Sequence, residues 1–215
     1  LNVTDSDLQD NRATSEGGGL FAFNAATVQR SAFVGNQAPI GGAVRSLGNA
    51  LIGDSQFTNN VASNGGGGVV GDNVTVQDGA FTSNRATNNG GGIWAINMAV
   101  SDTEFISNTA GQNGGAVNGI GSTAISNTTF LSNTANLGGG LYGGGAVRVS
   151  GTDFSQNHAV FGAGLFVDGG HTRITGTTFR NNTATFNGGG ASIENLGTAD
   201  VSATNFANNQ SGQFG

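Results

Sequence analysis

The chain has 215 residues, a net charge of −6 and no cysteine, and only 9% of its residues are charged. All seven basic residues are arginines scattered along the chain, so neither a nucleic-acid-binding surface nor electrostatic docking on anionic lipid is expected. The lack of cysteine excludes disulfide bridges and thiolate metal sites, and no apolar run approaches the ~20 residues of a membrane-spanning helix.

One repeat runs through the whole chain. Each copy centres on an anchor residue, and neighbouring anchors are 24 to 27 residues apart: Leu8, Phe33, Phe57, Phe81, Phe105, Phe130, Phe154, Phe179 and Phe206. A fixed period of this length is typical of a solenoid, in which each repeat forms one coil. The sequence therefore predicts a single domain over residues 1–215, with about nine coils of 24–25 residues.

The coils are predicted to consist of short β-strands and turns, because glycine, asparagine and threonine interrupt every segment too often for helices. An aliphatic residue such as Val76 stands five positions before each anchor, and serine or threonine often stands two before it. Alternate residues of a strand face the same side. The aliphatic residue is an odd number of positions before the anchor, so both can face the interior only if the chain turns between them. The residue three before the anchor is Asp, Asn or Gly in seven of nine copies, and these types tolerate a left-handed turn.

An asparagine stands three residues after every anchor. Its amide has two donors and two acceptor lone pairs, so it can bond both a buried turn and the amide of the next coil. We interpret this column as an internal asparagine ladder and not as a row of ligand-binding side chains: Asn36, Asn60, Asn84, Asn108, Asn133, Asn157 and Asn182. The glycine runs that follow, such as 65–68, lack the helix and the Lys-Ser/Thr of a phosphate-binding loop, so they are predicted to be turns.

The second half of the chain carries an apolar column seven residues after the anchor, where earlier copies are mostly polar: Leu137, Phe161 and Phe186. Three stacked coils would place these side chains as a strip along one corner. Two interpretations remain open. The side chains fold over the corner and cover the core, or they form a lateral contact surface of the kind that contiguous apolar patches mark.

A second column follows the aliphatic residue that closes each glycine run, and it includes four aromatic residues: Phe21, Trp94, Tyr142 and Phe166. Strand parity directs these side chains outward if neighbours such as Leu20 and Ile93 point inward. Outward aromatics can stack on sugar rings or pack against another subunit. The alternatives are ordinary surface aromatics or a register slip that buries them. The connections that follow vary most near 168–173 and 194–200, where a repeat scaffold tends to carry binding specificity.

Two motifs alternate along the chain: Gly-Gly-Ala-aliphatic, as in Gly41-Gly42-Ala43-Val44, and Phe-x-x-Asn. This alternation resembles the repeat of the chlamydial polymorphic outer-membrane proteins and related bacterial surface proteins. The resemblance spans essentially the whole chain. It implies a right-handed parallel β-helix, and an autotransporter-type passenger at the cell surface that is usually adhesive. The chain differs in lacking cysteine and a translocating barrel, and in often having a third glycine in place of the alanine.

Some parallel β-helices are pectin- or alginate-degrading enzymes, which need acidic residues converging on one groove. The best candidate is the stack of Asp54, Asp78 and Asp102 in three consecutive copies, where calcium could bind. The same column holds Gly151 and Gly176, which favours solvated turn carboxylates. With two histidines and no lysine to act as a base, the sequence favours a protein that is not an enzyme and needs no cofactor. A polysaccharide lyase or hydrolase is the alternative.

The sequence thus favours a non-enzymatic extracellular β-solenoid at the bacterial cell surface, with a structural or adhesive role. As a passenger segment of a longer protein, it would contact a host protein or a polysaccharide. As a fibre subunit, it would associate laterally or end to end, with the strand edge near Leu1 pairing with the edge near Gly215 of another copy. Partners of other kinds, such as nucleic acid or a membrane that this segment inserts into, are not expected.

Overall fold

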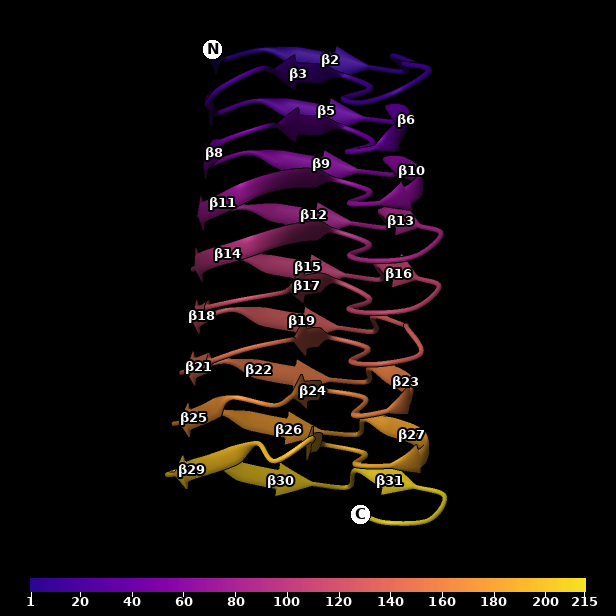
Figure 1. Ribbon diagram of the computed structural model, residues 1–215, viewed down its shortest axis with the longest axis vertical. Helices are drawn as coiled ribbons and strands as arrows, with labels where there is room; N and C mark the ends of the chain where they lie inside the picture. Colours follow the sequence, from indigo (N-terminus) through magenta and orange to yellow (C-terminus); the bar gives the residue numbers. More distant parts are fainter.

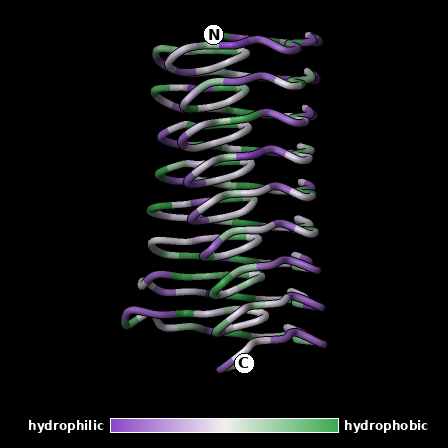
Figure 2. The backbone as a smooth tube through the Cα atoms, turned by 90° about the vertical axis from the view of Figure 1, so that its right-hand side faces the viewer, coloured by the Kyte–Doolittle hydropathy of each residue, from purple (hydrophilic) through white to green (hydrophobic).

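The structure, a computed structural model, describes residues 1–215, and its regular elements are all strands (Figure 1). The strands lie in coils stacked along one axis, and the N and C termini lie at opposite ends of the stack (Figure 2). Each strand pairs in parallel with the equivalent strand of at least one neighbouring coil. The all-β parallel solenoid of about nine coils is therefore confirmed. The chain contains no helix that could cross a membrane.

The first wall is a 15-stranded sheet, because most coils contribute two strands to it. The segment that precedes the turn before the anchor forms β1 (Asn2–Thr4), β4 (Ala26–Gln29), β8 (Asn49–Gly53), β18 (Thr123–Ser126), β21 (Val147–Ser150), β25 (His171–Thr175) and β29 (Thr198–Ser202). The segment after the glycine run forms β3 (Leu20–Ala22), β7 (Val44–Ser46), β17 (Val117–Gly119), β20 (Leu141–Gly143), β24 (Leu165–Asp168) and β28 (Ala191–Glu194). In two middle coils the segments are continuous, as β11 (Val69–Gln77) and β14 (Ile93–Ser101).

The second wall carries the anchors in a 9-stranded sheet. Its strands are β2 (Asp7–Gln9), β5 (Ala32–Val34), β9 (Gln56–Thr58), β12 (Ala80–Thr82), β15 (Glu104–Ile106), β19 (Thr129–Leu131), β22 (Asp153–Ser155), β26 (Thr178–Arg180) and β30 (Asn205–Ala207). The third wall follows the ladder asparagines. It contains β6 (Gln37–Ile40), β10 (Val61–Gly65), β13 (Arg85–Ala86) and β16 (Thr109–Ala110), then β23 (His158–Phe161), β27 (Thr183–Asn187) and β31 (Gln210–Ser211).

The anchor phenylalanines form a single stack through the core. Neighbouring rings lie 4.6–5.1 Å apart between centroids and are nearly parallel, from Phe33 to Phe206. This spacing matches the ~4.8 Å between paired strands, so the in-register pairing of the second wall places each ring directly over the next. Aliphatic side chains of the first wall, such as Val76 and Ile93, complete one continuous core of 28 buried residues.

The asparagine column forms the predicted ladder. Asn108 illustrates it: its Nδ2 donates to Oδ1 of Asn133 at 3.1 Å and to the backbone oxygen of Phe81 at 2.8 Å. Its Oδ1 accepts hydrogen bonds from the backbone nitrogen and from Nδ2 of Asn84, both at 3.0 Å. All four hydrogen-bonding positions of the buried amide are therefore filled. The bond between side chains repeats in every coil from Asn11 to Asn209.

The turn before each anchor has the left-handed conformation predicted from its Asp, Asn and Gly residues. All nine residues of this column have φ between 44° and 58°, including Arg30 and Ala203, whose types did not predict it. The residue just before each ladder asparagine is also left-handed, with φ between 54° and 66°. The sequence did not reveal this second turn because its residue types are mixed, as Ser83 and Gln156 show.

We expect Gly176→Asn to raise the free energy of unfolding by about 0.5 kcal/mol, because it restricts the unfolded chain without straining the folded one. Gly176 has φ +58°, and the nearest atom to an added Cβ would be 3.9 Å away. Asn127 already occupies the equivalent turn with φ 47°. As a control, Gly162→Asn should destabilise, because its Cβ would lie 2.5 Å from the Leu165 oxygen. Urea unfolding measures the free energy of unfolding of both variants. If Gly176→Asn destabilises the chain as much as Gly162→Asn, the turn at Gly176 has no room for a side chain.

Candidate functional site

The aromatic column predicted from the sequence lies on the outer side of the first wall. Consecutive strands pair Phe21 with Arg45, Val70 with Trp94, and so on in one unbroken row. We call this row the outer column: Phe21, Arg45, Val70, Trp94, Asn118, Tyr142, Phe166 and Ser192. Neighbouring residues such as Ile93 and Leu141 are fully buried in the core. Strand parity therefore holds, and no register slip turns the aromatics inward.

The exposure of the outer column varies along the solenoid. Phe21 is 42% exposed, whereas Phe166 is only 4% exposed, and Trp94 and Tyr142 are half-buried. The reason is that the glycine corner lies against the column. A Cβ on Gly65 would be 2.5 Å from a ring carbon of Trp94, so the indole lies over backbone that has no side chain. Phe166 is thus outside the core but covered, and it contributes little open surface.

The corner carries the apolar strip predicted from the second half of the chain. Leu137 pairs with Phe161, and both are half-buried, while Phe186 is 39% exposed. The rings of Phe161 and Phe186 stack at 5.5 Å. The pairing partner of Phe161 is Asn187 and not Phe186, because the register shifts by one residue between β23 and β27. The strip therefore exists, with Leu137 and Phe161 half-buried and Phe186 facing solvent.

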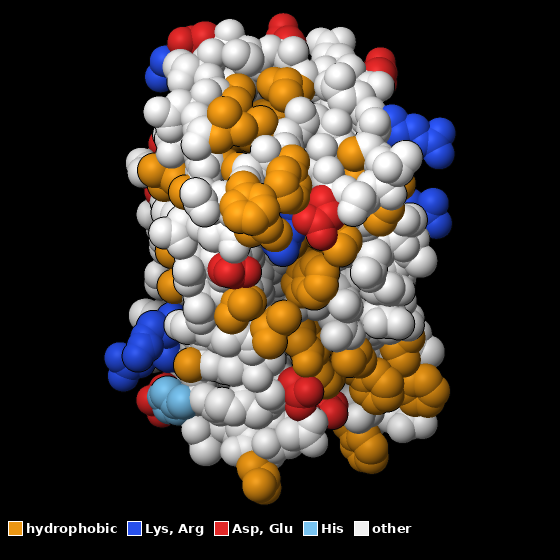
Figure 3. All heavy atoms as spheres, turned by 45° about the horizontal axis from the view of Figure 1, so that its top comes forward, with side chains coloured by type: hydrophobic (Ala, Val, Ile, Leu, Met, Phe, Trp, Pro, Cys, Tyr) orange, Lys and Arg blue, Asp and Glu red, His pale blue; other side chains and the backbone are white.

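A third row of apolar side chains stands two residues after the outer column. Phe23 is exposed, and Ile96 and Ile120 are each 48% exposed. Ile96 and Ile120, together with the half-buried Trp94, border a hollow of about 260 Å³. Figure 3 shows hydrophobic side chains gathered in a band along one face, with acidic side chains among them. We define the contact face as Phe21, Phe23, Trp94, Ile96, Ile120, Leu137, Tyr142, Phe161 and Phe186.

Two polar interactions fix side chains at the contact face. Arg45 Nε lies 3.5 Å from a carboxylate oxygen of Glu16, between the outer column and the corner. The Tyr142 hydroxyl donates to Oδ2 of Asp168 at 3.1 Å, and the Tyr142 ring stacks on Phe166 at 5.8 Å. Burial, then the negative charge of Asp168 and this hydrogen bond, raise the pKa of Tyr142 to about 12. The phenol therefore stays neutral and keeps its hydrogen bond well above pH 10.

Titration of Tyr142 gives a direct test of this geometry, because it is the one tyrosine of the chain. We expect ultraviolet titration of the folded chain to show phenolate forming with a midpoint near pH 12, against a reference pKa of 10.0. The stability that the neutral phenol contributes is complete below pH ~10 and is lost as the pH rises towards ~12. In Asp168→Asn the pKa should fall but stay raised by burial. A midpoint near pH 10 in the folded parent chain would contradict the arrangement.

The candidate calcium ligands lie in one column but show no metal-binding geometry. Asp54, Asp78 and Asp102 stand in one column at the turn before the anchor, far from the contact face in the coil, and no group of three acidic or histidine side chains has metal-binding geometry. Nδ2 of Asn127 donates to Asp102 at 3.2 Å. His158 is exposed on the third wall, while His171 Nε2 lies 3.2 Å from Asp200. The three aspartates line one open depression of about 260 Å³ together with Glu104, and neither histidine lines it.

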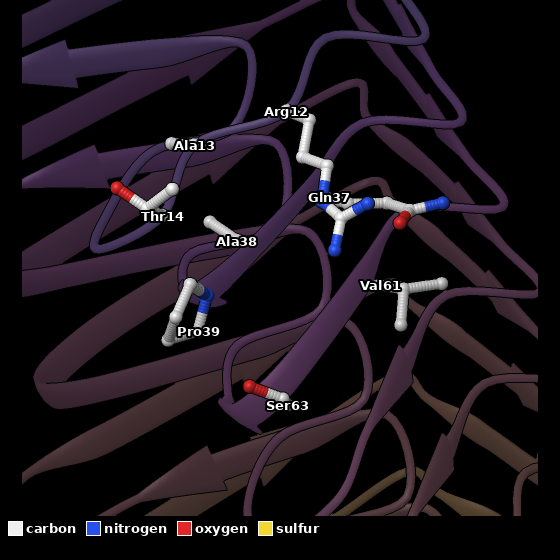
Figure 4. Close-up of a pocket in the computed structure, with 8 residues that line it drawn as sticks. All are labelled: Arg12, Ala13, Thr14, Gln37, Ala38, Pro39, Val61 and Ser63. Carbon is white, nitrogen blue, oxygen red and sulfur yellow. The ribbon is translucent and has the colours of Figure 1, made fainter.

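A depression of about 310 Å³ opens on the outer side of the third wall near the N terminus (Figure 4). The Arg12 side chain extends towards Gln37, with Pro39, Val61 and Ser63 around the depression. No carboxylate or imidazole lines it, so it offers no acid–base pair.

A second asparagine ladder, which our sequence analysis missed, lies on the outer surface. Nδ2 of Asn73 donates to Asn49 at 3.0 Å, and Nδ2 of Asn97 donates to Asn73 at 3.1 Å. All three are exposed. Their common spacing of 24 residues was the available signal, but it is confined to three coils.

Residues 54–72 and 78–96 each match the family model of the Chlamydia polymorphic membrane protein repeat. Each segment runs from the turn before an anchor, through the ladder asparagine and glycine corner, to the outer column. Two adjacent coils therefore carry this repeat. The resemblance read from the Gly-Gly-Ala-aliphatic and Phe-x-x-Asn motifs is confirmed in these coils. Searches of curated proteins and of solved structures found no match to the chain.

The two matched segments include both positions that form the core and one position of the contact face. The matched segments contain the fold-forming positions Phe57, Asn60, Phe81 and Asn84, together with Trp94 of the contact face. The match supports a bacterial surface protein and a cell-surface location in general. It assigns no ligand and no catalytic residue.

Proposed function

We propose that the chain is a non-enzymatic scaffold segment of a bacterial surface protein, and that it adheres to a partner through the contact face. The observation that carries the proposal is the contrast between its inner and outer rows. The inner rows, the phenylalanine stack and the asparagine ladder, are buried and fully bonded. The contact face repeats along the same coils, yet leaves side chains such as Ile96 and Ile120 half exposed.

The inner rows support a mechanical role. Each coil is stabilised mainly by its neighbours in a solenoid, and here each ladder amide between the two ends bonds to the coils on both sides, as Asn108 does. Such a stack keeps surface side chains at a fixed spacing along the axis. A scaffold of this kind can hold a row of aromatic side chains away from the cell. The stack itself fixes their positions, so no partner is needed to order them.

The contact face supports adhesion because it combines aromatic and aliphatic surface with few charges. Interface cores are enriched in aromatic residues and depleted of charged ones. The partners consistent with this chemistry are a host protein, a polysaccharide that stacks on the rings, or a second copy of the chain. The experiment must therefore distinguish lateral association of copies from binding to a different partner.

We expect Trp94→Ala to leave the fold intact and to abolish most adhesion. The chain would be displayed on a bacterium that does not adhere to epithelial cells, and bound bacteria would be counted. Trp94 is half-buried against Gly65, so the loss of stability should be about 1–2 kcal/mol. Leu51→Ala is the control, because Leu51 is an exposed apolar residue outside the contact face.

Equal adhesion of the parent and Trp94→Ala, with both folded, would contradict the proposal. Adhesion lost in both variants would show that the contact face is not the specific surface. Light scattering of the purified chain over a concentration series separates a host partner from self-association, since only the latter raises the mass with concentration. If the chain is instead an enzyme, polysaccharide cleavage should be detectable and should fall in Asp78→Asn.

A further inference from the structure

Two arginines face each other on neighbouring coils. Arg148 on β21 and Arg173 on β25 are paired residues of adjacent parallel strands, which lie ~4.8 Å apart. Both side chains are exposed on the outer side of the first wall. Like charges directly opposite each other in a sheet are destabilising. Figure 3 shows basic side chains projecting together at one edge, beside a histidine and an acidic side chain.

Two other arginines of the chain are neutralised across coils. Arg30 and Arg180 each form a two-pronged pair with an aspartate of the preceding coil, with shortest distances of 2.7 Å. Arg148 forms no salt bridge. The one carboxylate near Arg173, that of Asp200, lies 3.9 Å from Nη2 and is closer to His171, at 3.2 Å. In a chain with a surplus of six negative charges, this pair of guanidinium groups is left without a matched carboxylate.

A hollow of about 320 Å³ begins at Arg148 and runs along the outer side of β21, β18, β14 and β11. Arg173 does not line it but stands beside Arg148 on the next strand, just beyond its end. Its floor includes Ala99 and Ala124, and one side carries Ser101, Ser126 and Ser150. The serine hydroxyls donate no hydrogen bond within the chain, whereas their backbone oxygens accept bonds from the following threonines. The hollow therefore combines an apolar floor, a row of free hydroxyls and positive charge at one end.

We propose that this hollow binds an acidic polysaccharide, with an oxyanion group of one sugar on Arg148 and Arg173. Guanidinium groups match carboxylate and sulfate oxygens in geometry and charge. A sugar ring lies against the alanine floor, and its hydroxyls bond the serine row. An anionic membrane fits less well, because membrane docking uses clusters of about four to eight basic residues. This site lies on the same wall as part of the contact face, but nearer the turn before the anchor, and the two share no residue.

The test is calorimetric titration of the purified chain with polygalacturonate, dextran sulfate and neutral dextran, and with phosphatidylserine vesicles. We expect one of the two acidic polymers to bind, and neutral dextran and the vesicles not to bind. The double variant Arg148→Gln/Arg173→Gln should weaken binding about tenfold or more, since both charge-assisted contacts are lost. Arg85→Gln is the control, because Arg85 is an exposed arginine on the third wall and its loss changes the net charge in the same direction.

A second variant tests the hollow itself. Ala124→Leu fills the floor but keeps both arginines, and it should weaken polysaccharide binding about fivefold or more while leaving the melting temperature near that of the parent. Binding of polygalacturonate alone assigns a carboxylate ligand, and binding of dextran sulfate alone assigns a sulfate ester. The inference is overturned if neither polymer binds, if the vesicles bind as well as the polymers, or if Arg85→Gln weakens binding as much as the double variant.

Discussion

Replacing Asn108 with leucine will lower the free energy of unfolding by about 3–5 kcal/mol, because buried polar groups lose their partners. The amide of Asn108 donates two hydrogen bonds and accepts two. Leucine leaves the Phe81 carbonyl, the Asn133 oxygen and two donors of Asn84 without these bonds, in a site closed to water. For a chain of this size the melting temperature should fall by about 10 °C.

The matched control is Asn97→Leu. Asn97 stands in the outer ladder and makes similar bonds to Asn73 and to the Ser122 nitrogen, but it is exposed, so water replaces the lost partners. Asn97→Leu should lower the free energy of unfolding by less than about 1 kcal/mol. Denaturation in urea measures both variants. If the two asparagines cost the same to replace, burial of the inner ladder would not be the source of its stability.

Phe105→Ala will destabilise the chain by about 3–5 kcal/mol, because it opens a cavity that the stack cannot close. The Phe105 ring lies 4.9 Å from Phe81 and 5.1 Å from Phe130. In-register strands hold both neighbours in place on either side. The second wall therefore cannot collapse into the gap without breaking its backbone hydrogen bonds.

Phe23→Ala is the control for Phe105→Ala, because it removes the same side chain from an exposed position. It should change the free energy of unfolding by less than about 0.5 kcal/mol. Calorimetric melting of the two variants measures the difference. A loss of less than about 1 kcal/mol in Phe105→Ala would contradict a rigid phenylalanine stack.

The fold was largely predictable because one physical constraint repeats in every coil. A parallel stack places each residue beside its counterpart one period away, so the phenylalanine and asparagine columns identify core and ladder by their spacing alone. The left-handed turn at Ser83 and Gln156 was not predictable, since many polar types occur there. Arg30 and Ala203 show the same limit: the coils on either side impose a conformation that these residue types disfavour.

The candidate site was predictable in position but not in exposure. Strand parity correctly directs Trp94 and Phe166 out of the core. The exposed fraction of each side chain depends on the backbone path at the glycine corner. The pattern of residue types in the sequence does not give that path. The register shift that pairs Phe161 with Asn187 instead of Phe186 comes from one extra residue in a strand. Counting positions from the anchor does not reveal this extra residue. The opposed pair Arg148 and Arg173 also becomes visible only when the coils are stacked.

Nuclear magnetic resonance detection of couplings across hydrogen bonds tests the ladder, on which the scaffold depends, most directly. The structure predicts that the side-chain nitrogen of Asn84 couples to the side-chain carbonyl of Asn108 and to the backbone carbonyl of Phe57, with distances of 3.0 and 2.8 Å. The corresponding amide protons should exchange with water far more slowly than those of the exposed Asn97. Fast exchange of the Asn84 side chain, without either coupling, would contradict an internal ladder and the rigid scaffold built on it.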